Sequence, residues 1–395
     1  MQTNYTCISL FCGCGGFDLG MVQQRIECIA AFDINKQAVS VYNNNLPPVA
    51  IERDLLQSYN FKKYNSDIII SGAPCQGFST AGKRELRDPR NKLFHRSVEI
   101  ALKVKPKVFV AENVAGILSG RHKIEYMEAA TSSLQAAGYT TAVEIVDCRN
   151  LGMAQMRKRV LLFAWNTKKE ILLPIHKEQP KTIRDIIELI PITAKNHDIT
   201  GCMAVGSQQS IAKHIQQGQK LSNVRKGEYA VHTWHIPDVF GKTTPKEQEV
   251  LEAILRVRRQ CRVRDWGDAD PVSLGNLMNY LGFDPASEVK TLKEKKYIKD
   301  KPDNKIDLTN TFNGKFRRLN WDAQSLTVDT RFGSPVLFLH PTEDRAYTVR
   351  EAARLQGFPD SFIFEGSRKS QYEMVGNAVP PPLGQYAANI VKGLL

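Results

Sequence analysis

The stretch at residues 6–16, TCISLFCGCGG, decides the fold class of this 395-residue chain. Its first part, Thr6–Leu10, is largely apolar and is typical of a buried β-strand, and a helix is expected directly after the glycines. Glycine lets the backbone pass close to a ligand, and a helix N-terminus presents free N–H groups to negative charge. The stretch therefore predicts a strand, a ligand-binding glycine loop and a helix at the start of an α/β fold.

The same alternation of short apolar runs with amphipathic stretches continues to about residue 165. Strands are expected at Thr6–Leu10, Cys28–Phe32, Val49–Ile51, Asp67–Ile70, Val108–Ala111, Thr140–Val146 and Val160–Trp165. Helices are expected at Phe17–Arg25, Lys36–Asn44, Asn91–Val104 and His122–Ala137. This order predicts a Rossmann-like α/β domain, with a mostly parallel sheet covered by helices on both faces.

Two acidic residues follow the glycine loop at informative positions. Asp33 lies 20 residues beyond Gly13, where an acid can bind the hydroxyls of a ribose. The position at which a nicotinamide-binding loop has its third glycine holds Asp18, so the Gly-x-Gly-Gly form favours S-adenosylmethionine instead. Asp54 follows the third predicted strand and could accept a hydrogen bond from an adenine amino group. Either acid alone is typical of a cap or turn, and their order and spacing favour the cofactor.

A second motif, residues 72–79 with the sequence GAPCQGFS, follows the apolar run at residues 67–71. It places Cys75 just past the end of a predicted buried strand, where a nucleophile can meet a ligand. An unpaired cysteine is far more often a small buried hydrophobic residue than a catalyst. The octapeptide therefore indicates an active site only in combination with other motifs.

Composition narrows the classes of protein that the chain can belong to. Its length favours two domains, and its net charge of +13 with a pI near 9.3 favours a polyanionic partner such as nucleic acid. No apolar run approaches the roughly 20 residues that cross a bilayer, and the N-terminus has no secretory signal, so we expect a cytoplasmic protein. The eight cysteines lack the spacing of a zinc module or disulfide scaffold, so we expect reduced thiols and no metal site.

Further motifs complete a recognisable series. In chain order they are Phe11-x-Gly13-x-Gly15-Gly16, Asp33, Asp54, residues 72–79, Glu112-Asn113-Val114, Gln155-x-Arg157-x-Arg159, Arg318-Leu319 with Ser325-x-Thr327, and Gly376-Asn377-Ala378-Val379-Pro380. This series resembles that of the DNA (cytosine-5)-methyltransferases and spans nearly the whole chain. Asp33 stands where that family commonly has Glu, and Asn35 occupies a place that is often acidic.

The resemblance implies a mechanism of methyl transfer to carbon 5 of cytosine. Cys75 would add as a thiolate to carbon 6, which makes carbon 5 nucleophilic. Arg157 and Arg159 would surround the thiolate with positive charge, with Arg159 also near the base oxygen, and Glu112 would hold and share a proton at ring nitrogen 3. The target base would have to be rotated out of the duplex.

The resemblance also implies the residues that bind the cofactor and the DNA. Those for S-adenosylmethionine are Phe11, Gly13, Gly15, Gly16, Asp33, Ile34, Asp54, Leu55, Pro74 and Asn377. Those for double-stranded DNA are Gln76, Ser79, Lys83, Arg84, Arg87 and Arg318. Residues 76–91 are expected to form a lid over the flipped base.

The chain loses the αβ alternation from about residue 166, which predicts a second domain. We expect a catalytic domain at 1–175 plus 370–395 and a smaller target-recognition domain at 176–369. Within the latter, helices at Pro245–Arg259, Pro271–Leu281 and Pro285–Lys296 and a hairpin at Tyr297–Leu308 resemble a winged helix-turn-helix. Its third helix would carry Lys290, Lys293, Lys295 and Lys296. The alternative for this segment is a solvated helical insertion.

Two other functions remain open at this point. A related scaffold could methylate cytosine in RNA, and a DNA-binding transcriptional regulator could use the possible winged helix, with methylation secondary. We expect a monomer that acts on duplex DNA. A cognate restriction endonuclease could act on the same site without forming a stable complex.

Overall fold

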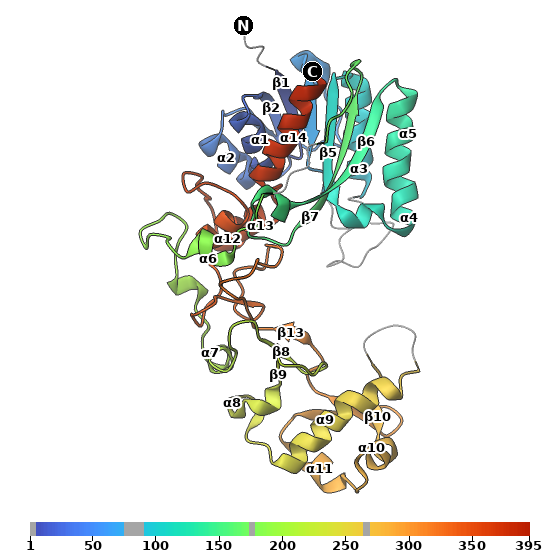
Figure 1. Ribbon diagram of the computed structural model, residues 1–395, viewed down its shortest axis with the longest axis vertical. Coiled ribbons are helices and arrows are strands. Elements are labelled where there is room, and N and C mark those ends of the chain that lie inside the picture. Colours follow the sequence, from blue (N-terminus) through green and yellow to red (C-terminus); the bar gives the residue numbers. More distant parts are fainter. Residues whose placement is uncertain (1–4, 75–90, 174–177, 264–268) are drawn as a thin grey trace. The chain divides into compact units, whose positions relative to one another are not determined.

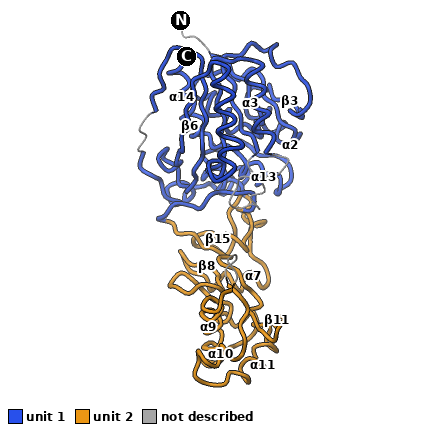
Figure 2. The backbone as a smooth tube through the Cα atoms, turned by 90° about the vertical axis from the view of Figure 1, so that its right-hand side faces the viewer, with its two compact units in different colours: residues 1–197, 322–331, 349–395 blue, residues 198–321, 332–348 orange. Residues whose placement is uncertain are grey.

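The computed structural model describes residues 5–74, 91–173, 178–263 and 269–395. The chain divides into two compact units, which Figure 2 shows in different colours: unit 1 is residues 1–197, 322–331 and 349–395, and unit 2 is residues 198–321 and 332–348. This division differs from the expected one, because residues 176–197, 322–331 and 349–369 belong to unit 1. Main-chain bonds from Ser325 N–H to Ala154 O (2.8 Å) and from Arg350 N–H to Asn196 O (2.9 Å) tie these segments to unit 1.

Unit 1 is built on one seven-stranded sheet (Figure 1). Its strands are β1 (Thr6–Leu10), β2 (Glu27–Asp33), β3 (Ala50–Glu52), β4 (Ile68–Ser71), β5 (Val108–Val114), β6 (Thr140–Asp147) and β7 (Lys158–Trp165). They lie in the order β3-β2-β1-β4-β5-β7-β6, and only β7 runs antiparallel to its neighbours. The predicted α/β fold is confirmed, with each of the expected strands present and its ends shifted by at most three residues.

Helices cover both faces of this sheet. The helices of unit 1 are α1 (Gly16–Gln23), α2 (Lys36–Asn45), α3 (Lys92–Val104), α4 (Gly120–His122), α5 (Ala129–Ala136), α6 (Ile183–Ile187), α12 (Val349–Leu355), α13 (Arg368–Asn377) and α14 (Pro381–Leu394). A π-helical segment, Lys123–Glu128, joins α4 to α5. Adjacent strand residues point to opposite faces, so Ile8 and Ile69 pack with α3 and α5, whereas Cys7 and Ile68 pack with α1 and α14.

The strand order determines where a ligand can bind. β1 lies between β2 and β4, so the chain builds one half of the sheet outward through β2 and β3 and the other half from β4 onward. At such a switch point the connections after the two central strands diverge and leave a crevice beyond their carboxyl ends. The glycine loop follows β1, and Gly72–Pro74 follow β4. Both motifs therefore meet at this crevice.

Unit 2 contains small sheets and short helices. Its elements are α7 (Ser207–Ala212), β8 (Lys220–Ser222), β9 (Ala230–Val231), α8 (Pro237–Phe240), α9 (Pro245–Gln260), β10 (Val272–Ser273), α10 (Leu274–Leu281), α11 (Ala286–Glu294), β11 (Ile298–Lys301), β12 (Lys305–Leu308), β13 (Asn313–Lys315), β14 (Arg317–Arg318) and β15 (Phe338–Leu339). The expected helices and hairpin at 245–308 correspond to α9, α10, α11 and β11–β12, and β10 is an additional strand. Among the described residues, no helix has the length and apolar character that crossing a membrane requires.

Candidate active site

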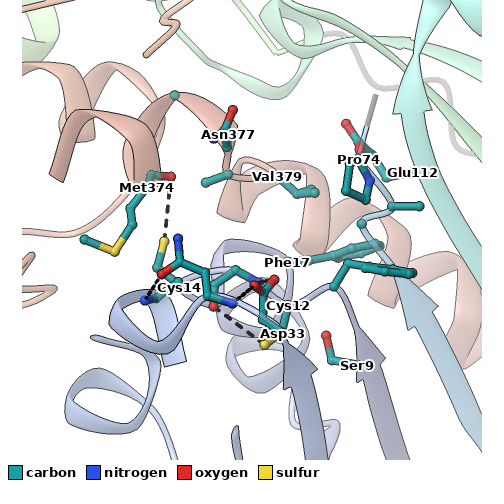
Figure 3. A pocket seen from close by; sticks show the side chains of 18 of the residues that line it. Ser9, Cys12, Cys14, Phe17, Asp33, Pro74, Glu112, Met374, Asn377 and Val379 are labelled. Atoms are coloured by element: carbon teal, nitrogen blue, oxygen red, sulfur yellow. Dashed lines mark hydrogen bonds between the residues drawn. The ribbon is translucent and has the colours of Figure 1, made fainter. Parts of the chain in front are cut away.

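A cavity of about 390 Å³ opens in unit 1 at the carboxyl ends of β1, β2, β4 and β5 (Figure 3). It is lined by Ser9, Phe11, Cys12, Gly13, Cys14, Phe17, Asp33, Ile34, Asn35, Ala38, Gly72, Ala73, Pro74, Glu112, Arg157, Arg159, Glu373, Met374, Gly376, Asn377, Ala378 and Val379. The glycine loop, Asp33, the segment before Cys75 and the Glu112 motif, which are far apart in sequence, therefore share one cavity.

The glycines of the loop are required for two different physical reasons. Gly13 (φ 54°) and Gly15 (φ 94°) have the left-handed backbone that glycine adopts without strain. Gly16 has an ordinary backbone, but a Cβ there would lie 2.2 Å from the main-chain oxygen of Val379. The third glycine thus makes room for the C-terminal segment of the chain, whereas the sequence predicted that it makes room for a ligand.

Asp33 at the end of β2 bridges the glycine loop and the start of α2. Its carboxylate accepts hydrogen bonds from the main-chain N–H groups of Gly13 (2.9 Å) and Asn35 (2.8 Å). Burial raises the pKa of Asp33 above its ordinary value, and these N–H groups oppose the shift. The neighbouring Ile34 is 68% exposed, so an apolar side chain lies beside the carboxylate at the cavity.

Asp54 and Leu55 do not line this cavity, contrary to the expectation. The Asp54 carboxylate accepts the N–H of Leu56 at 2.9 Å, which is the bonding pattern of a turn residue. Leu55 is 3% exposed and belongs to the same hydrophobic core cluster as Phe61. The structure therefore gives both residues local structural contacts.

Glu112 and Arg159 form a buried ion pair at the cavity. Glu112 pairs with Leu161 across β5 and β7, so Arg159 is its diagonal neighbour on the same face of the sheet. Arg159 Nε lies 2.8 Å from Glu112 Oε1, and both side chains are largely enclosed. Burial raises the pKa of Glu112, while the positive charges of Arg159 and Arg157 act in the opposite direction. The cavity thus contains a buried carboxyl with a raised pKa beside a permanent cation.

Arg157 joins three segments of unit 1 at the wall of the cavity. It is 3% exposed, and its guanidinium donates to the main-chain oxygens of Val328 (3.2 Å) and Ala378 (3.0 Å). These bonds hold the Ser325-x-Thr327 and Gly376–Pro380 motifs against β7. Arg157 is therefore positioned to organise the cavity, and its charge still acts on Glu112.

Comparison with known proteins identifies the family of this chain. The sequence profile of the C-5 cytosine-specific DNA methylases matches residues 5–392. The chain belongs to this family. The methylase is 27% identical to the Type II methyltransferase M.HgiBI of Herpetosiphon aurantiacus, covering 95% of this chain and 94% of that protein. It is 30% identical to the Type II methyltransferase M.DdeI of Desulfomicrobium norvegicum, covering 98% and 88%.

Solved structures show the same fold. The Dnmt2 methyltransferase of S. pombe superimposes on the methylase with a TM-score of 0.59 at 16% identity, covering 99% of each chain. At this identity the likeness concerns the fold alone. The resemblance inferred from the motif series is confirmed by the family match.

Part of the predicted catalytic and DNA-binding set lies outside the described residues of the methylase. These positions are Cys75, Gln76, Ser79, Lys83, Arg84 and Arg87. The described segment ends at Pro74, which lines the cavity. Asn113 Nδ2 donates to Ala73 O at 3.4 Å, so the residue after Glu112 holds the chain just before Cys75.

Arg318 of the methylase differs from its predicted role in DNA binding. It lies in unit 2, is 6% exposed, and its nitrogens donate to the main-chain oxygens of Ile215 (2.6 Å), Ala212 (2.8 Å) and His340 (2.9 Å). Its guanidinium also pairs with the carboxylate of Asp344. A buried guanidinium with these partners stabilises unit 2, so the structure does not support a contact with DNA.

The sequence prediction did not assign a binding role to several residues that line the cavity. They are Ser9, Cys12, Cys14, Phe17, Asn35, Ala38, Gly72, Ala73, Glu373, Met374, Gly376, Ala378 and Val379. Glu373 lies one helical turn before Asn377 at the end of α13. A helix predicted to run into the Gly376-Asn377 motif would have identified that face, because residues three and four apart share one side of a helix.

Proposed function

We propose that this methylase transfers a methyl group from S-adenosylmethionine to carbon 5 of cytosine within a specific sequence of duplex DNA. One observation carries the proposal: a single cavity joins the glycine loop and Asp33 to the Glu112–Arg159 pair and to Pro74, which precedes Cys75. A cofactor site and a base-activating carboxyl therefore lie within reach of one small substrate ring.

The residues at the glycine-loop end of the cavity fit the cofactor. Asp33 offers a half-buried carboxylate for ribose hydroxyls, and the exposed side chain of Ile34 offers an apolar surface for adenine. A Cβ added to Gly13 would have no neighbouring atom within 4 Å, so the backbone is open to a ligand there. Phe11 and Asn377 would complete the binding set. S-adenosylmethionine supplies the methyl group when it is bound.

Glu112 and Arg159 would act on the cytosine ring. As the Cys75 thiolate forms a bond to carbon 6, negative charge develops on the ring, and a proton shared between Glu112 and nitrogen 3 neutralises it. Burial raises the pKa of Glu112, which favours sharing that proton. Arg159, fixed by Glu112, would donate to the base oxygen. After methylation, a base removes the carbon 5 proton and the thiolate leaves, which restores the ring.

The DNA contacts in this proposal come mainly from residues 76–91. A base inside a duplex is inaccessible to Cys75, so it is rotated out at a cost of a few kcal/mol. Gln76, Ser79, Lys83, Arg84 and Arg87 follow the nucleophile directly in sequence and would contact the duplex around the vacated position. The methylase would act on the duplex as a monomer.

The relatives named Type II methyltransferases support a place in a restriction–modification system. A cognate endonuclease would then read the same site without a stable complex with the methylase. The chain would protect that site by modifying it.

The test is expression in cells that lack cytosine methylation, followed by mapping of 5-methylcytosine across the genome. We expect one sequence context to be modified by the wild-type chain and none by Cys75→Ala. DNA containing 5-fluorocytosine should form a covalent adduct that depends on Cys75. A genome without any modified context would refute the proposed function, and an adduct that persists in Cys75→Ala would refute the mechanism.

A further inference from the structure

The segment at residues 245–308 of unit 2 has an element order that the catalytic function leaves unexplained. α9 leads to the short strand β10, and two helices, α10 and α11, follow (Figure 1). The hairpin β11–β12 closes the segment. The three strands form one sheet in the order β10-β12-β11, so the strand between the first two helices pairs with the last strand of the hairpin. Helix, strand, helix, helix and hairpin with this pairing is the arrangement of a winged helix.

We propose that residues 245–308 form a winged-helix module that gives this methylase a second contact with duplex DNA, with α11 reading bases and the β11–β12 hairpin holding phosphates. The inference rests on the proposed function and deepens it, since duplex DNA is the ligand in both. Binding and methyl transfer are measured separately, so that failure of one is distinguished from failure of the other.

The module has a core of its own that fixes the orientation of α11. Val250 and Ile254 of α9, Leu277 of α10, Leu292 of α11 and Ile306 of β12 pack together, each at most 2% exposed. A buried ion pair between Arg258 Nε and Asp307 Oδ1 (2.7 Å) adds a specific link from α9 to β12. A helix held in this way presents a defined outer face.

That outer face of α11 carries side chains suited to base edges. Val289 and Leu292 point into the core, whereas Ser287, Lys290 and Glu294 are exposed. The exposed positions are spaced by three and four residues, so they form one stripe along the helix. Hydroxyl, ammonium and carboxylate groups are donors and acceptors for base edges in the major groove. α11 therefore has an apolar side that anchors it and a polar side that can meet a ligand.

The lysines predicted for this helix divide into two groups. Lys293 pairs with Asp300 (2.6 Å) and Lys295 pairs with Glu247 (2.8 Å), so both contribute to the module itself. Lys290 stays on the exposed stripe, and Lys296 is also exposed but lies beyond the end of α11. Of the predicted lysines, Lys290 is therefore the one that this proposal assigns to the bases.

The hairpin has an arrangement of charge that is explained by an anionic partner. Lys301 and Lys305 are directly opposite each other across β11 and β12, and neither pairs with a carboxylate among the described residues. Like charges opposite each other in a sheet are destabilising. Asp303 (φ 61°) and Asn304 (φ 53°) form the tight turn between them. A DNA phosphate bound by each of the two ammonium groups would offset this repulsion.

The experiment compares two double variants of the full chain that remove the same charge. Lys301→Ala with Lys305→Ala removes the hairpin lysines. Lys103→Ala with Lys105→Ala removes two exposed lysines of unit 1 that precede β5, at the end of the sheet opposite the cavity. The affinity for a duplex of about 40 base pairs, long enough to span several helical turns, is measured by fluorescence anisotropy over a range of salt concentrations, and thermal unfolding checks that each variant is folded.

We plot the logarithm of the association constant for DNA against the logarithm of the salt concentration. Lys301→Ala with Lys305→Ala should reduce the magnitude of the slope by about 1.8, because each phosphate contact contributes about 0.9, whereas the control double variant should leave the slope unchanged. In a library with randomised bases around the modified cytosine, Lys290→Ala should abolish a preference at one or two positions that the wild type shows. Equal slopes in both double variants, or a preference untouched by Lys290→Ala, would overturn the proposal and point to a protein partner. A changed slope in a chain without methylation activity would support the module and refute the proposed function.

Discussion

Replacement of Glu112 by glutamine tests the centre of the proposed chemistry. The substitution keeps the size of the side chain and an oxygen that can accept from Arg159, but it removes the group that shares a proton with nitrogen 3. Glu112 is 7% exposed and lies 2.8 Å from Arg159 Nε, so water cannot readily take over its role. We therefore expect catalysis to fall while binding of DNA is preserved.

The magnitude follows from the geometry of the pair. A positioned acid or base contributes about 10²–10⁴-fold to a rate, which corresponds to about 3–5 kcal/mol of barrier. Arg159 stays charged in the variant, and removing one partner of a buried ion pair costs about 3–5 kcal/mol, which is an upper limit here because glutamine keeps an oxygen that can accept from Arg159. Glu112→Gln should thus lose at least about 100-fold in kcat when folded protein is assayed, with a decrease of at most about 3–5 kcal/mol in the free energy of unfolding.

The assay is single-turnover methyl transfer to a duplex that carries the mapped site, with DNA affinity and urea unfolding measured in parallel. Glu125→Gln, an exposed glutamate of unit 1, is the control for the charge change. Methylation by Glu112→Gln within about threefold of the wild type would refute the role assigned to Glu112. A loss of activity accompanied by global unfolding would show a structural role instead.

Three further predictions concern the framework around the cavity. Arg157→Ala removes two charge-assisted hydrogen bonds to main-chain oxygens, so urea unfolding should show a loss of roughly 3 kcal/mol, and a loss below about 1 kcal/mol would contradict the anchoring role. Gly16→Ala should destabilise the protein more than Gly13→Ala, because only the former brings a Cβ against Val379 O; thermal unfolding of both variants checks the order. Burial raises the pKa of Asp18 to about 6, so the folded state favours the protonated carboxyl. The stability that this protonated carboxyl contributes is complete below the ordinary carboxyl pKa and is lost as pH rises through about 6. As pH rises from about 4 to 7.5, the free energy of unfolding of Asp18→Asn should therefore increase by about 3 kcal/mol relative to that of the wild type. Urea unfolding measures this difference, and a difference that does not change with pH would refute the prediction.

The α/β fold of unit 1 could be predicted because its signals are local. Each strand is a short apolar run bounded by turn residues, and alternation with amphipathic stretches leaves few arrangements other than a parallel sheet. The antiparallel pairing of β7 with β5 and β6 was not predicted, because nothing in the residues of β7 encodes the direction of its partners. In unit 2 the two-residue strand β10 is too short to leave a pattern.

The candidate site also has a part that could be predicted from the sequence and a part that could not. Gly13, Asp33 and Glu112 follow predicted strands directly, and the carboxyl ends of parallel strands meet at one edge, so the sequence alone placed them together. The motifs of Gly16, Arg157 and Arg318 indicated ligand contacts. Their partners in the structure are main-chain atoms of other segments of the chain, namely those of Val379, Ala378 and His340 respectively.

The sequence by itself determined the family, the order of the strands along the chain and the chemical groups available for methyl transfer, since these depend on residue type and spacing. Only the tertiary structure decided which of those groups face the cavity and which are used inside the protein. The reason is that a glycine, an arginine or a lysine has the same signature in sequence whether its neighbour is a ligand or a distant part of its own chain. Packing alone distinguishes Glu112, which lines the cavity, from Arg318, whose donors are used within unit 2.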